Sequence, residues 1–302
     1  MGLLAGKTAV VTGAGRGIGR GHALHLAASG AQVVVNDIDE TASSDVVAEI
    51  EKNGGQAVVS THSIASRDGA AALIQFAVDR FGGIDILVNN AGNLRDRTFL
   101  KMTDDEFDSV WLVHVKGTFW CAQVAVKHMV EQGRGGVIIN TTSGGHFGSF
   151  GQTNYAAAKG AIASMTYTWA IELAKHGIRV NAIGPLGSTR MSATYRDSAG
   201  NKGIEFDPAL NGPMVVYLAS DEADFVSGQI FGTGGERLAH MVQPHYGKTL
   251  VQPGGWNLES IREHFRVQMQ GEFGPFGILG KPYPFHDGVK LAAANAAQEG
   301  SK

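Results

Sequence analysis

Short apolar runs recur along the first 240 positions of the chain, and amphipathic stretches of helical length separate them. The runs, which are rich in β-branched residues, lie at 9–12, 32–36, 57–60, 84–89, 136–142, 179–183 and 229–233. The predicted helices lie at 18–29, 41–53, 68–81, 104–132, 154–176 and 208–220. Apolar strands that alternate with single helices are typical of a parallel sheet buried on both faces. The pattern therefore predicts a doubly wound α/β fold, whose ligands bind at the carboxyl ends of the strands.

The pattern changes near residue 240. Beyond it the chain carries Pro244, a Pro-Gly-Gly sequence at 253–255, one helix-like stretch at 258–269 and further Gly/Pro-rich segments. Such a tail is too short and too rich in turn residues to build a second hydrophobic core. We expect a single domain over 1–240, with a lid segment near 187–213. The remaining residues, 241–302, are expected to form a C-terminal extension that covers this domain or a neighbouring subunit.

Composition excludes several classes of function. The formal net charge of −3 provides no electrostatic attraction for nucleic acid or an anionic membrane surface. Cys121 is the only cysteine, which fits a reducing compartment. The chain has no signal-peptide layout and no apolar run of membrane-spanning length. We therefore expect a cytoplasmic protein without nucleic-acid or membrane partners. The pairs His22/His25 and His240/His245 lack a third ligand at metal spacing, so we expect no metal site.

A glycine-rich turn joins the first predicted strand to the first predicted helix. Residues 12–19 read TGAGRGIG. The strict fingerprint G-x-G-x-x-G does not fit, whereas the spacing G-x-x-x-G-x-G does. Glycines let a backbone approach a pyrophosphate, whose charge then faces the helix N-terminus. An ordinary strand-to-helix turn is the alternative, but the position of this turn favours a dinucleotide site. The residues expected to contact the cofactor here are Gly13, Arg16, Gly17, Ile18 and Gly19.

Asp37 directly follows the second predicted strand, about 20 residues beyond the glycines. A carboxylate at this position accepts hydrogen bonds from both adenosine ribose hydroxyls and repels a 2′-phosphate. Arg16 acts in the opposite sense, because a cation in this turn attracts that phosphate. We expect Asp37 to dominate, since it lies where the ribose hydroxyls bind. The predicted cofactor is therefore NAD.

Tyr155 and Lys159 are four residues apart and share one face of a predicted helix. A free phenol has a pKa near 10, and an adjacent ammonium stabilises the phenolate. Such a pair suits the removal of a proton from an alcohol. Alone, Y-x-x-x-K is common on any helix. Here it accompanies the glycine turn, Asp37, the strand end Asn89-Asn-Ala-Gly92 and the strand 138–143, which reads IINTTS.

Together these motifs resemble the short-chain dehydrogenase/reductase family over about residues 5–240. That resemblance implies a Rossmann-like fold and hydride transfer between a nicotinamide and a secondary alcohol or ketone. Residues 89–98 (NNAGNLRDRT), 113–117 (VHVKG) and 150–155 (FGQTNY) further resemble the (3R)-hydroxyacyl-CoA dehydrogenase branch found in multifunctional β-oxidation enzymes. Members of that branch are also described as 17β-hydroxysteroid dehydrogenases.

The resemblance assigns roles to matching positions. Tyr155 would be the acid/base, Lys159 would support it and bind the nicotinamide ribose, and Ser143 would hold the substrate oxygen. His114 occupies the position of an asparagine that usually supports the lysine. The other cofactor contacts would come from Ser63, Ile64, Asn89, Ala91, Gly92, Pro185 and Thr189.

Two departures from the family pattern leave questions open. Ser143 and Tyr155 are twelve positions apart, one fewer than in most members, so either the loop between them is shorter or Thr142 supplies the hydroxyl. Strand register favours Ser143. Ser63, followed by Ile64, replaces an acidic residue that usually contacts adenine, which would cost about 1 kcal/mol of hydrogen bonding.

The substrate is predicted less narrowly than the reaction. We expect an apolar alcohol or ketone, with a (3R)-hydroxyacyl-CoA favoured over a hydroxysteroid, and a cofactor-binding protein without turnover as the rival class. A trough for an apolar chain could be lined by Phe147, Phe150, Met191 and Tyr195. Cations for CoA phosphates could come from Arg95, Arg97, Arg190, Arg196 and Lys202. The family resemblance also implies a homo-tetramer or at least a dimer.

Overall fold

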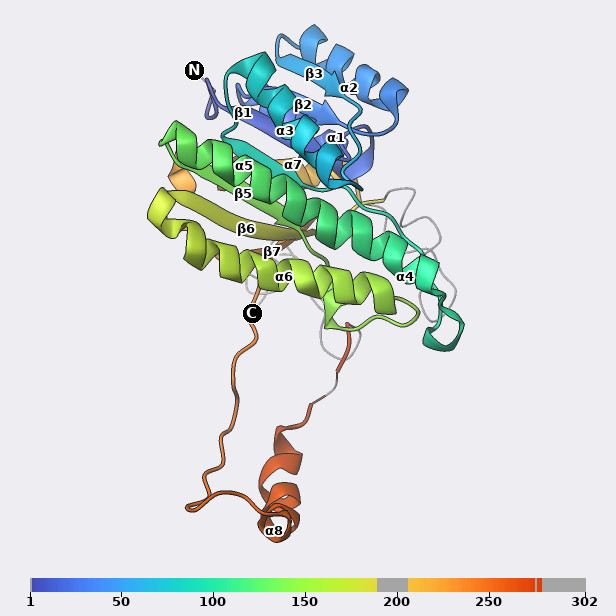
Figure 1. Ribbon diagram of the computed structural model, residues 1–302, viewed down its shortest axis with the longest axis vertical. Helices are drawn as coiled ribbons and strands as arrows, with labels where there is room; N and C mark the ends of the chain where they lie inside the picture. Colours follow the sequence, from blue (N-terminus) through green and yellow to red (C-terminus); the bar gives the residue numbers. More distant parts are fainter. Residues whose placement is uncertain (1, 189–205, 275, 279–302) are drawn as a thin grey trace, which may run out of the picture.

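The computed structural model of the 302-residue chain describes residues 2–188, 206–274 and 276–278. Its centre is one eight-stranded sheet with the order β3-β2-β1-β4-β5-β6-β7-β8 (Figure 1). The strands are β1 (Thr8–Thr12), β2 (Gln32–Asn36), β3 (Gln56–Ser60), β4 (Ile86–Asn89), β5 (Gly136–Thr141), β6 (Ile178–Pro185), β7 (Ile230–Gly234) and β8 (Arg237–Met241). All neighbouring strands pair in parallel except β7 and β8. The predicted doubly wound α/β fold is confirmed.

Helices cover both faces of this sheet. They are α1 (Gly17–Ala28), α2 (Glu40–Lys52), α3 (Arg67–Phe81), α4 (Asp104–Trp111), α5 (Thr118–Gln132), α6 (Thr153–Leu173) and α7 (Gly212–Ala219). α1, α2 and α7 pack on one face, whereas α3, α5 and α6 pack on the other, which faces the viewer in Figure 1. This two-sided cover explains why the strands read as continuous apolar runs.

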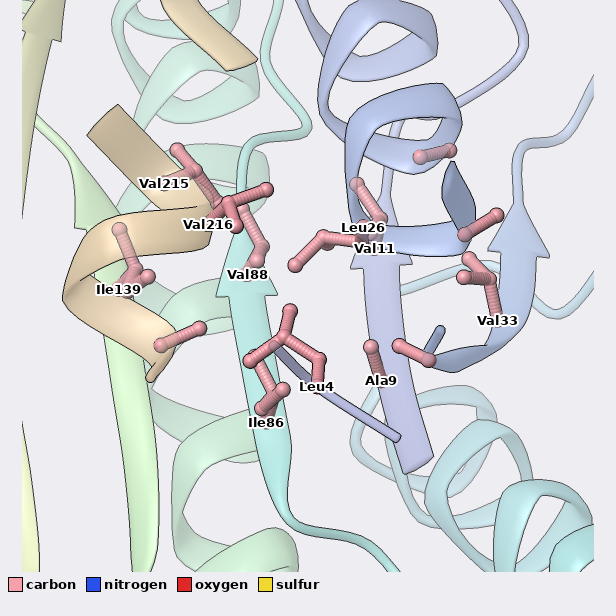
Figure 2. Close-up of a cluster of buried hydrophobic side chains, with 14 of the residues drawn as sticks. Leu4, Ala9, Val11, Leu26, Val33, Ile86, Val88, Ile139, Val215 and Val216 are labelled. Atoms are coloured by element: carbon pink, nitrogen blue, oxygen red, sulfur yellow. The ribbon is translucent and has the colours of Figure 1, made fainter. Parts of the chain in front are cut away.

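The core divides into two clusters because successive strand residues point to opposite faces. Val11 of β1 and Val88 of β4 meet Leu26 of α1 and Val215 of α7 on one face (Figure 2). Val10, the neighbour of Val11, belongs to the opposite cluster beneath α3 and α5. Alternate residues of each strand thus join the sheet to both helical layers.

The order of the strands locates the ligand-binding edge. The chain moves outward from β1 to β2 and β3, then returns to pair β4 with the other side of β1. Ligands of open α/β sheets bind at such a reversal, beyond the carboxyl ends of the strands. Thr12 ends β1 and Asn89 ends β4, so the glycine turn and the Asn89–Gly92 segment meet here.

Two elements differ from the sequence prediction. The predicted helix 104–132 contains a π-helical segment at Leu112–Gly117 between α4 and α5. This wider turn is frequently associated with functional sites, and it contains His114. The strand β8 was not predicted, because its five residues, RLAHM, form neither a continuous apolar run nor a strict alternation of apolar and polar side chains.

Beyond β8 the chain leaves the sheet. The helix α8 (Leu258–Met269) stands apart from the sheet and its helices in Figure 1, and it has no buried residue. The chain comes back at Ile278, whose backbone N–H donates to the carbonyl of Gly148, at 2.9 Å. Most of the predicted lid, 187–213, coincides with 189–205 and lies outside the described residues. Among the described helices, none has the length and apolar content needed to cross a membrane.

Candidate active site

The glycine turn between β1 and α1 leaves no room for side chains at two of its positions. A Cβ on Gly19 would lie 2.2 Å from the Gly13 carbonyl oxygen, and one on Gly13 would lie 2.8 Å from Cα of Ala91. Gly13 and Gly17 also have φ values of 64° and 53°, in the left-handed region that glycine adopts without strain. The turn therefore packs against the Asn89–Gly92 segment through its backbone.

The N-terminus of α1 is available to an anion. Its N-cap residue, Arg16, makes no side-chain cap hydrogen bond, so the first N–H groups of the helix have no such acceptor. By contrast, α2 and α3 are capped by the side chains of Asp39 and Ser66. The uncapped end of α1 and the tight turn before it suit a pyrophosphate.

Thr12 and Asn90 hold the turn in place, and the sequence patterns did not single out either of them. The Thr12 hydroxyl accepts hydrogen bonds from the backbone N–H groups of Asn90 and Ala91, each at 3.0 Å. The Asn90 amide donates to the carbonyls of Thr12 and Gly13, at 2.9 and 3.1 Å. These contacts join the ends of β1 and β4.

Asp37 and Arg16 have separate partners. The Asp37 carboxylate accepts the backbone N–H groups of Gly15 and Asp39, both at 3.1 Å. Arg16 instead forms an ion pair with the carboxylate of Asp39, and this contact raises the pKa of the Arg16 guanidinium. The cation that the sequence places near a 2′-phosphate is therefore engaged by a second carboxylate.

The remaining predicted cofactor contacts that the structure describes lie along the same edge of the sheet. Ser63 and Ile64 follow β3, and Ile64 is buried so close to the π-helical segment that a Cβ on Gly117 would lie 2.8 Å from its Cδ1. Pro185 is the last residue of β6. Thr189 lies outside the described residues.

Tyr155, Lys159 and Ser143 come together where β5 meets α6. The Ser143 side chain hydrogen-bonds to the Tyr155 phenol. The Lys159 ammonium lies 5.6 Å from the centroid of the Tyr155 ring and donates to the carbonyl of Thr141, at 2.6 Å. The sequence predicted this cluster, and the structure brings all three side chains into it.

Burial acts on both ionisable groups of this cluster. Burial raises the pKa of the Tyr155 phenol above its ordinary value, whereas the hydrogen bond from Ser143 lowers it. Burial lowers the pKa of Lys159 to about 7. A phenolate and an ammonium at this spacing would each offset the cost of burying the other charge.

Thr142 and Ser143 have different surroundings. The Thr142 hydroxyl is buried and donates to the backbone carbonyl of Lys159, at 2.9 Å. The Ser143 hydroxyl accepts the N–H of Gly145, at 3.1 Å, and also meets Tyr155. The geometry thus agrees with the strand register that favours Ser143.

His114 borders the cluster from the π-helical segment. Its ring meets the Tyr155 ring edge to face, with centroids 5.5 Å apart. Nε2 lies 3.0 Å from the backbone nitrogen of Asn93 and 2.9 Å from its carbonyl oxygen, while Nδ1 is buried with no partner in the described structure. Burial and the nearby Lys159 charge lower the pKa of His114 to about 3, so the ring is neutral at neutral pH.

Two asparagines support the cluster. The Asn154 amide donates to the carbonyls of Arg95 and Glu106, at 2.9 and 3.0 Å, and its side-chain oxygen accepts the N–H of Tyr155. Asn89 donates to Asn140 at 3.0 Å, so its side chain lies inside the sheet edge. Asn154 immediately precedes the tyrosine, which is the one sequence signal that would have found it.

The predicted substrate contacts receive mixed support. Phe147 is half exposed and Phe150 is 93% exposed, so the described residues enclose neither of them in a trough. Arg97 pairs with Glu106 at 2.8 Å, whereas Arg95 is exposed. The other proposed lining and cationic residues, Met191, Tyr195, Arg190, Arg196 and Lys202, lie outside the described residues. Among the described side chains, no group of three His, Cys, Asp or Glu residues is arranged to hold a metal ion.

Comparison with known proteins places this arrangement in a family. The model of the short chain dehydrogenase family matches residues 7–199. The chain belongs to the short-chain dehydrogenase family. The matched span covers the glycine turn, Asp37, Ser143, Tyr155 and Lys159.

Three similar proteins represent its relatives. The peroxisomal hydratase-dehydrogenase-epimerase of Saccharomyces cerevisiae is 45% identical over 240 residues, which are 77% of this chain and 26% of the yeast protein. The crystal structure of a short chain dehydrogenase from Mycobacterium avium has 38% identity and a TM-score of 0.81, covering 91% of this chain and 98% of that one. A 7α-hydroxysteroid dehydrogenase in complex with NADH and 7-oxo glycochenodeoxycholic acid has 34% identity and a TM-score of 0.70, covering 77% of this chain and 94% of that one.

The family match establishes an oxidoreductase of the short-chain dehydrogenase family that acts on a CH–OH group. The hydroxysteroid dehydrogenase among its neighbours was solved with NADH bound. The resemblance to the hydratase-dehydrogenase branch, which rested on three short motifs, is confirmed at the level of sequence similarity.

Proposed function

We propose that this protein is an NAD-dependent dehydrogenase that interconverts a secondary alcohol and its ketone, and that a (3R)-hydroxyacyl-CoA is its substrate. The meeting of Ser143, Tyr155 and Lys159 at the same edge of the sheet as the uncapped end of α1 carries the proposal. It combines a proton acceptor with a dinucleotide site at one edge of the sheet.

In this proposal, Tyr155 takes the proton from the hydroxyl oxygen of the alcohol while a hydride leaves the carbon that bears this hydroxyl. NAD, when bound, would accept that hydride and return it in the reverse direction. Ser143 orients the substrate oxygen toward the phenol, and the Lys159 ammonium stabilises the phenolate.

His114 acts in this proposal on Lys159 rather than on the substrate. Nε2 lies within hydrogen-bond distance of both the backbone N–H and the carbonyl of Asn93. The proposal requires the tautomer in which Nε2–H donates to that carbonyl, so that Nδ1, which has no partner in the described structure, can accept a hydrogen bond. The lowered pKa of His114 keeps that acceptor neutral and available.

The cofactor site fits a dinucleotide. Gly13 and Gly19 allow the backbone approach that a pyrophosphate requires, and Asp37 lies at the end of β2 for the adenosine ribose. Gly17, Ile18, Asn89, Ala91, Gly92, Ser63, Ile64, Pro185 and Thr189 complete the proposed set of cofactor contacts. The preference for NAD over NADP follows from Asp37 and from the pairing of Arg16 with Asp39.

We expect kcat/KM with NAD to exceed that with NADP by on the order of 10²-fold, because a 2′-phosphate would meet the Asp37 carboxylate. Asp39→Ala should narrow this ratio, since it releases Arg16 to pair with the phosphate. Asp79→Ala, on the exposed side of α3, is the control. Initial rates with each cofactor measure the ratio. Equal or better turnover with NADP in the parent enzyme would show the assignment to be wrong.

The substrate class is supported by the relatives. The hydratase-dehydrogenase relative favours a hydroxyacyl-CoA, whereas the bile-acid complex of the other dehydrogenase favours a steroid as the alternative. A panel of (3R)-hydroxyacyl-CoA esters, hydroxysteroids and simple secondary alcohols, followed by NADH absorbance, separates these candidates. Turnover of hydroxysteroids but not of hydroxyacyl-CoA esters would identify the protein as a hydroxysteroid dehydrogenase instead. Binding of NADH without turnover of any compound would favour a cofactor-binding protein.

We propose that residues 1–240 form the catalytic unit and that the extension, 241–302, covers a neighbouring subunit in a homo-tetramer or dimer. Exposed apolar side chains on α8, among them Ile261 and Phe265, support this, because apolar surface outside the core favours association. The single buried cysteine, Cys121, supports a cytoplasmic location.

Light scattering at micromolar concentration should therefore give a mass that is a multiple of the chain mass. Ile261→Glu combined with Phe265→Glu should move the population toward smaller species, since both side chains lie on one face of α8. Val267→Glu, on another face of the same helix, is the matched control. A stable monomer of the parent protein would refute the proposed assembly.

A further inference from the structure

Two buried hydrogen bonds fasten α6 to the end of β5. The Thr142 hydroxyl donates to the backbone carbonyl of Lys159, at 2.9 Å. The Asn140 amide donates to the Thr166 hydroxyl, at 3.0 Å. Each contact joins a residue at the carboxyl end of β5 to a residue on the inner face of α6.

The second contact continues into the neighbouring strand. The Asn140 side-chain oxygen accepts the amide of Asn89 on β4, at 3.0 Å, and the Thr166 hydroxyl donates to the carbonyl of Ile162. Asn89, Asn140 and Thr166 are at most 3% exposed, so water cannot replace a lost partner without entering the core. Breaking such a contact leaves a buried polar group unsatisfied.

The spacing of these contacts determines the position of the helix. Lys159 and Thr166 are seven residues apart, which is about 10 Å along a helix and nearly two full turns. Asn140 and Thr142 are two residues apart and point to the same face of the strand. Two attachment points at this separation restrict both sliding and rotation of α6.

The lysine depends on this register. Its ammonium donates to the carbonyl of Thr141, which lies between Asn140 and Thr142 in the chain. A shift of the helix would move the ammonium relative to the Tyr155 ring, from whose centroid it is 5.6 Å away.

We propose that Thr142 and the Asn140–Thr166 pair are positioning residues, which set the register of α6 on β5 and thereby hold the Lys159 ammonium over Tyr155. This inference rests on the proposed function, because it assigns Thr142 a role in placing the lysine rather than in contacting the substrate. It also separates Thr142 from Ser143, whose hydroxyl meets the phenol.

Thr142→Val and Thr166→Val test the proposal, since each removes one hydroxyl and keeps the side-chain shape. We expect each to lower kcat on the order of 10-fold, as misplaced catalytic groups do. The KM for the alcohol should change by less than about 3-fold, because neither hydroxyl belongs to the proposed substrate contacts. Thr142→Ser and Thr166→Ser should restore kcat. Thr168→Val is the control, because this hydroxyl makes the same kind of bond, to the Ser164 carbonyl, on the exposed face of α6.

The decisive readout is the ionisation of Tyr155. The ultraviolet difference between each protein and its Tyr155→Phe counterpart isolates this phenol, and its midpoint should move to higher pH when the ammonium is displaced. A merely structural role would lower the unfolding temperature and leave this midpoint and the pH profile of kcat in place. That result would overturn the proposal.

The titration needs no substrate, so it remains informative if the parent enzyme turns over none of the compounds in the panel. In that case the proposed function fails, while an unshifted or shifted midpoint still decides the positioning role. Should a valine variant not fold, Thr142→Ala and Thr166→Ala remove the same hydroxyls with less branching. An unshifted midpoint in these folded variants counts against the proposal, and a shifted one supports it.

Discussion

Tyr155→Phe should lower kcat by on the order of 10³-fold while leaving the dissociation constant for NADH within about 3-fold of the parent value. The substitution removes the phenolic oxygen, which is the proposed proton acceptor, and keeps the ring. The ring retains its edge-to-face contact with His114 and its place beneath the Lys159 ammonium. The site should therefore stay assembled and lose only its chemistry.

Initial rates with the preferred alcohol measure kcat, and quenching of protein fluorescence by NADH measures the dissociation constant for NADH. Tyr167→Phe is a matched control, because Tyr167 lies on the same helix and packs against the small cluster around Met241. This control should retain the kcat of the parent. Turnover by Tyr155→Phe at a rate close to that of the parent would assign the proton transfer to another group and remove the basis of the proposed mechanism.

Acidification should unfold the protein between about pH 5 and 4, chiefly because of two buried histidines. Burial lowers the pKa of His22 to about 3, and burial together with Lys159 lowers the pKa of His114 to about 3. Their ordinary value is near 6.5. Between these limits the unfolded chain binds protons that the folded chain does not.

The direction of the effect follows from that difference. The free energy of unfolding has its full value above pH 6.5. Below that pH, each of the two histidines lowers it by about 1.4 kcal/mol for every pH unit. Two histidines therefore cost about 5 kcal/mol between pH 6.5 and 4.5, which is comparable with the whole free energy of unfolding of many domains. Lys159 adds little slope at the acidic end of this window, because its lowered pKa of about 7 leaves it mostly protonated in the folded state as well as in the unfolded state.

His22→Leu provides the sharpest test. Neither ring nitrogen of His22 has a hydrogen-bond partner in the described structure, so an apolar side chain removes the titration without breaking a contact. We expect the slope of unfolding free energy against pH to fall by about 1.4 kcal/mol per unit. Denaturant titrations at several pH values measure it. His245→Gln, exposed in the extension, should change nothing, and an unchanged slope in His22→Leu would contradict the assignment.

The fold and the main motifs were predictable because their signals are local. A buried parallel strand must be apolar on both faces. The alternation of apolar runs with amphipathic stretches therefore predicted the order of strands and helices without any knowledge of their contacts. The glycine turn and the Tyr155–Lys159 pair are each contained within eight residues, and Asp37 directly follows a strand. Residues this close in sequence keep the same relative positions wherever their helix or turn lies in the fold.

Contacts between distant segments were decided only by the tertiary structure. Arg16 could face a phosphate or a carboxylate, and the 23-residue separation from Asp39 conceals their ion pair in the sequence. Thr142 and Ser143 are adjacent, yet one hydroxyl turns to the carbonyl of Lys159 and the other to the Tyr155 phenol. Successive residues at a strand end point in opposite directions, so the position of α6 determines which hydroxyl meets which partner.

The same distinction explains the elements that the pattern missed. The π-helical turn around His114 has no residue composition that distinguishes it from the α-helical turns on either side. The strand β8 exists through its antiparallel pairing with β7, a partner that five residues cannot specify alone. The sequence by itself therefore determined the kind of fold and the chemical groups, whereas long-range packing decided which of those groups meet.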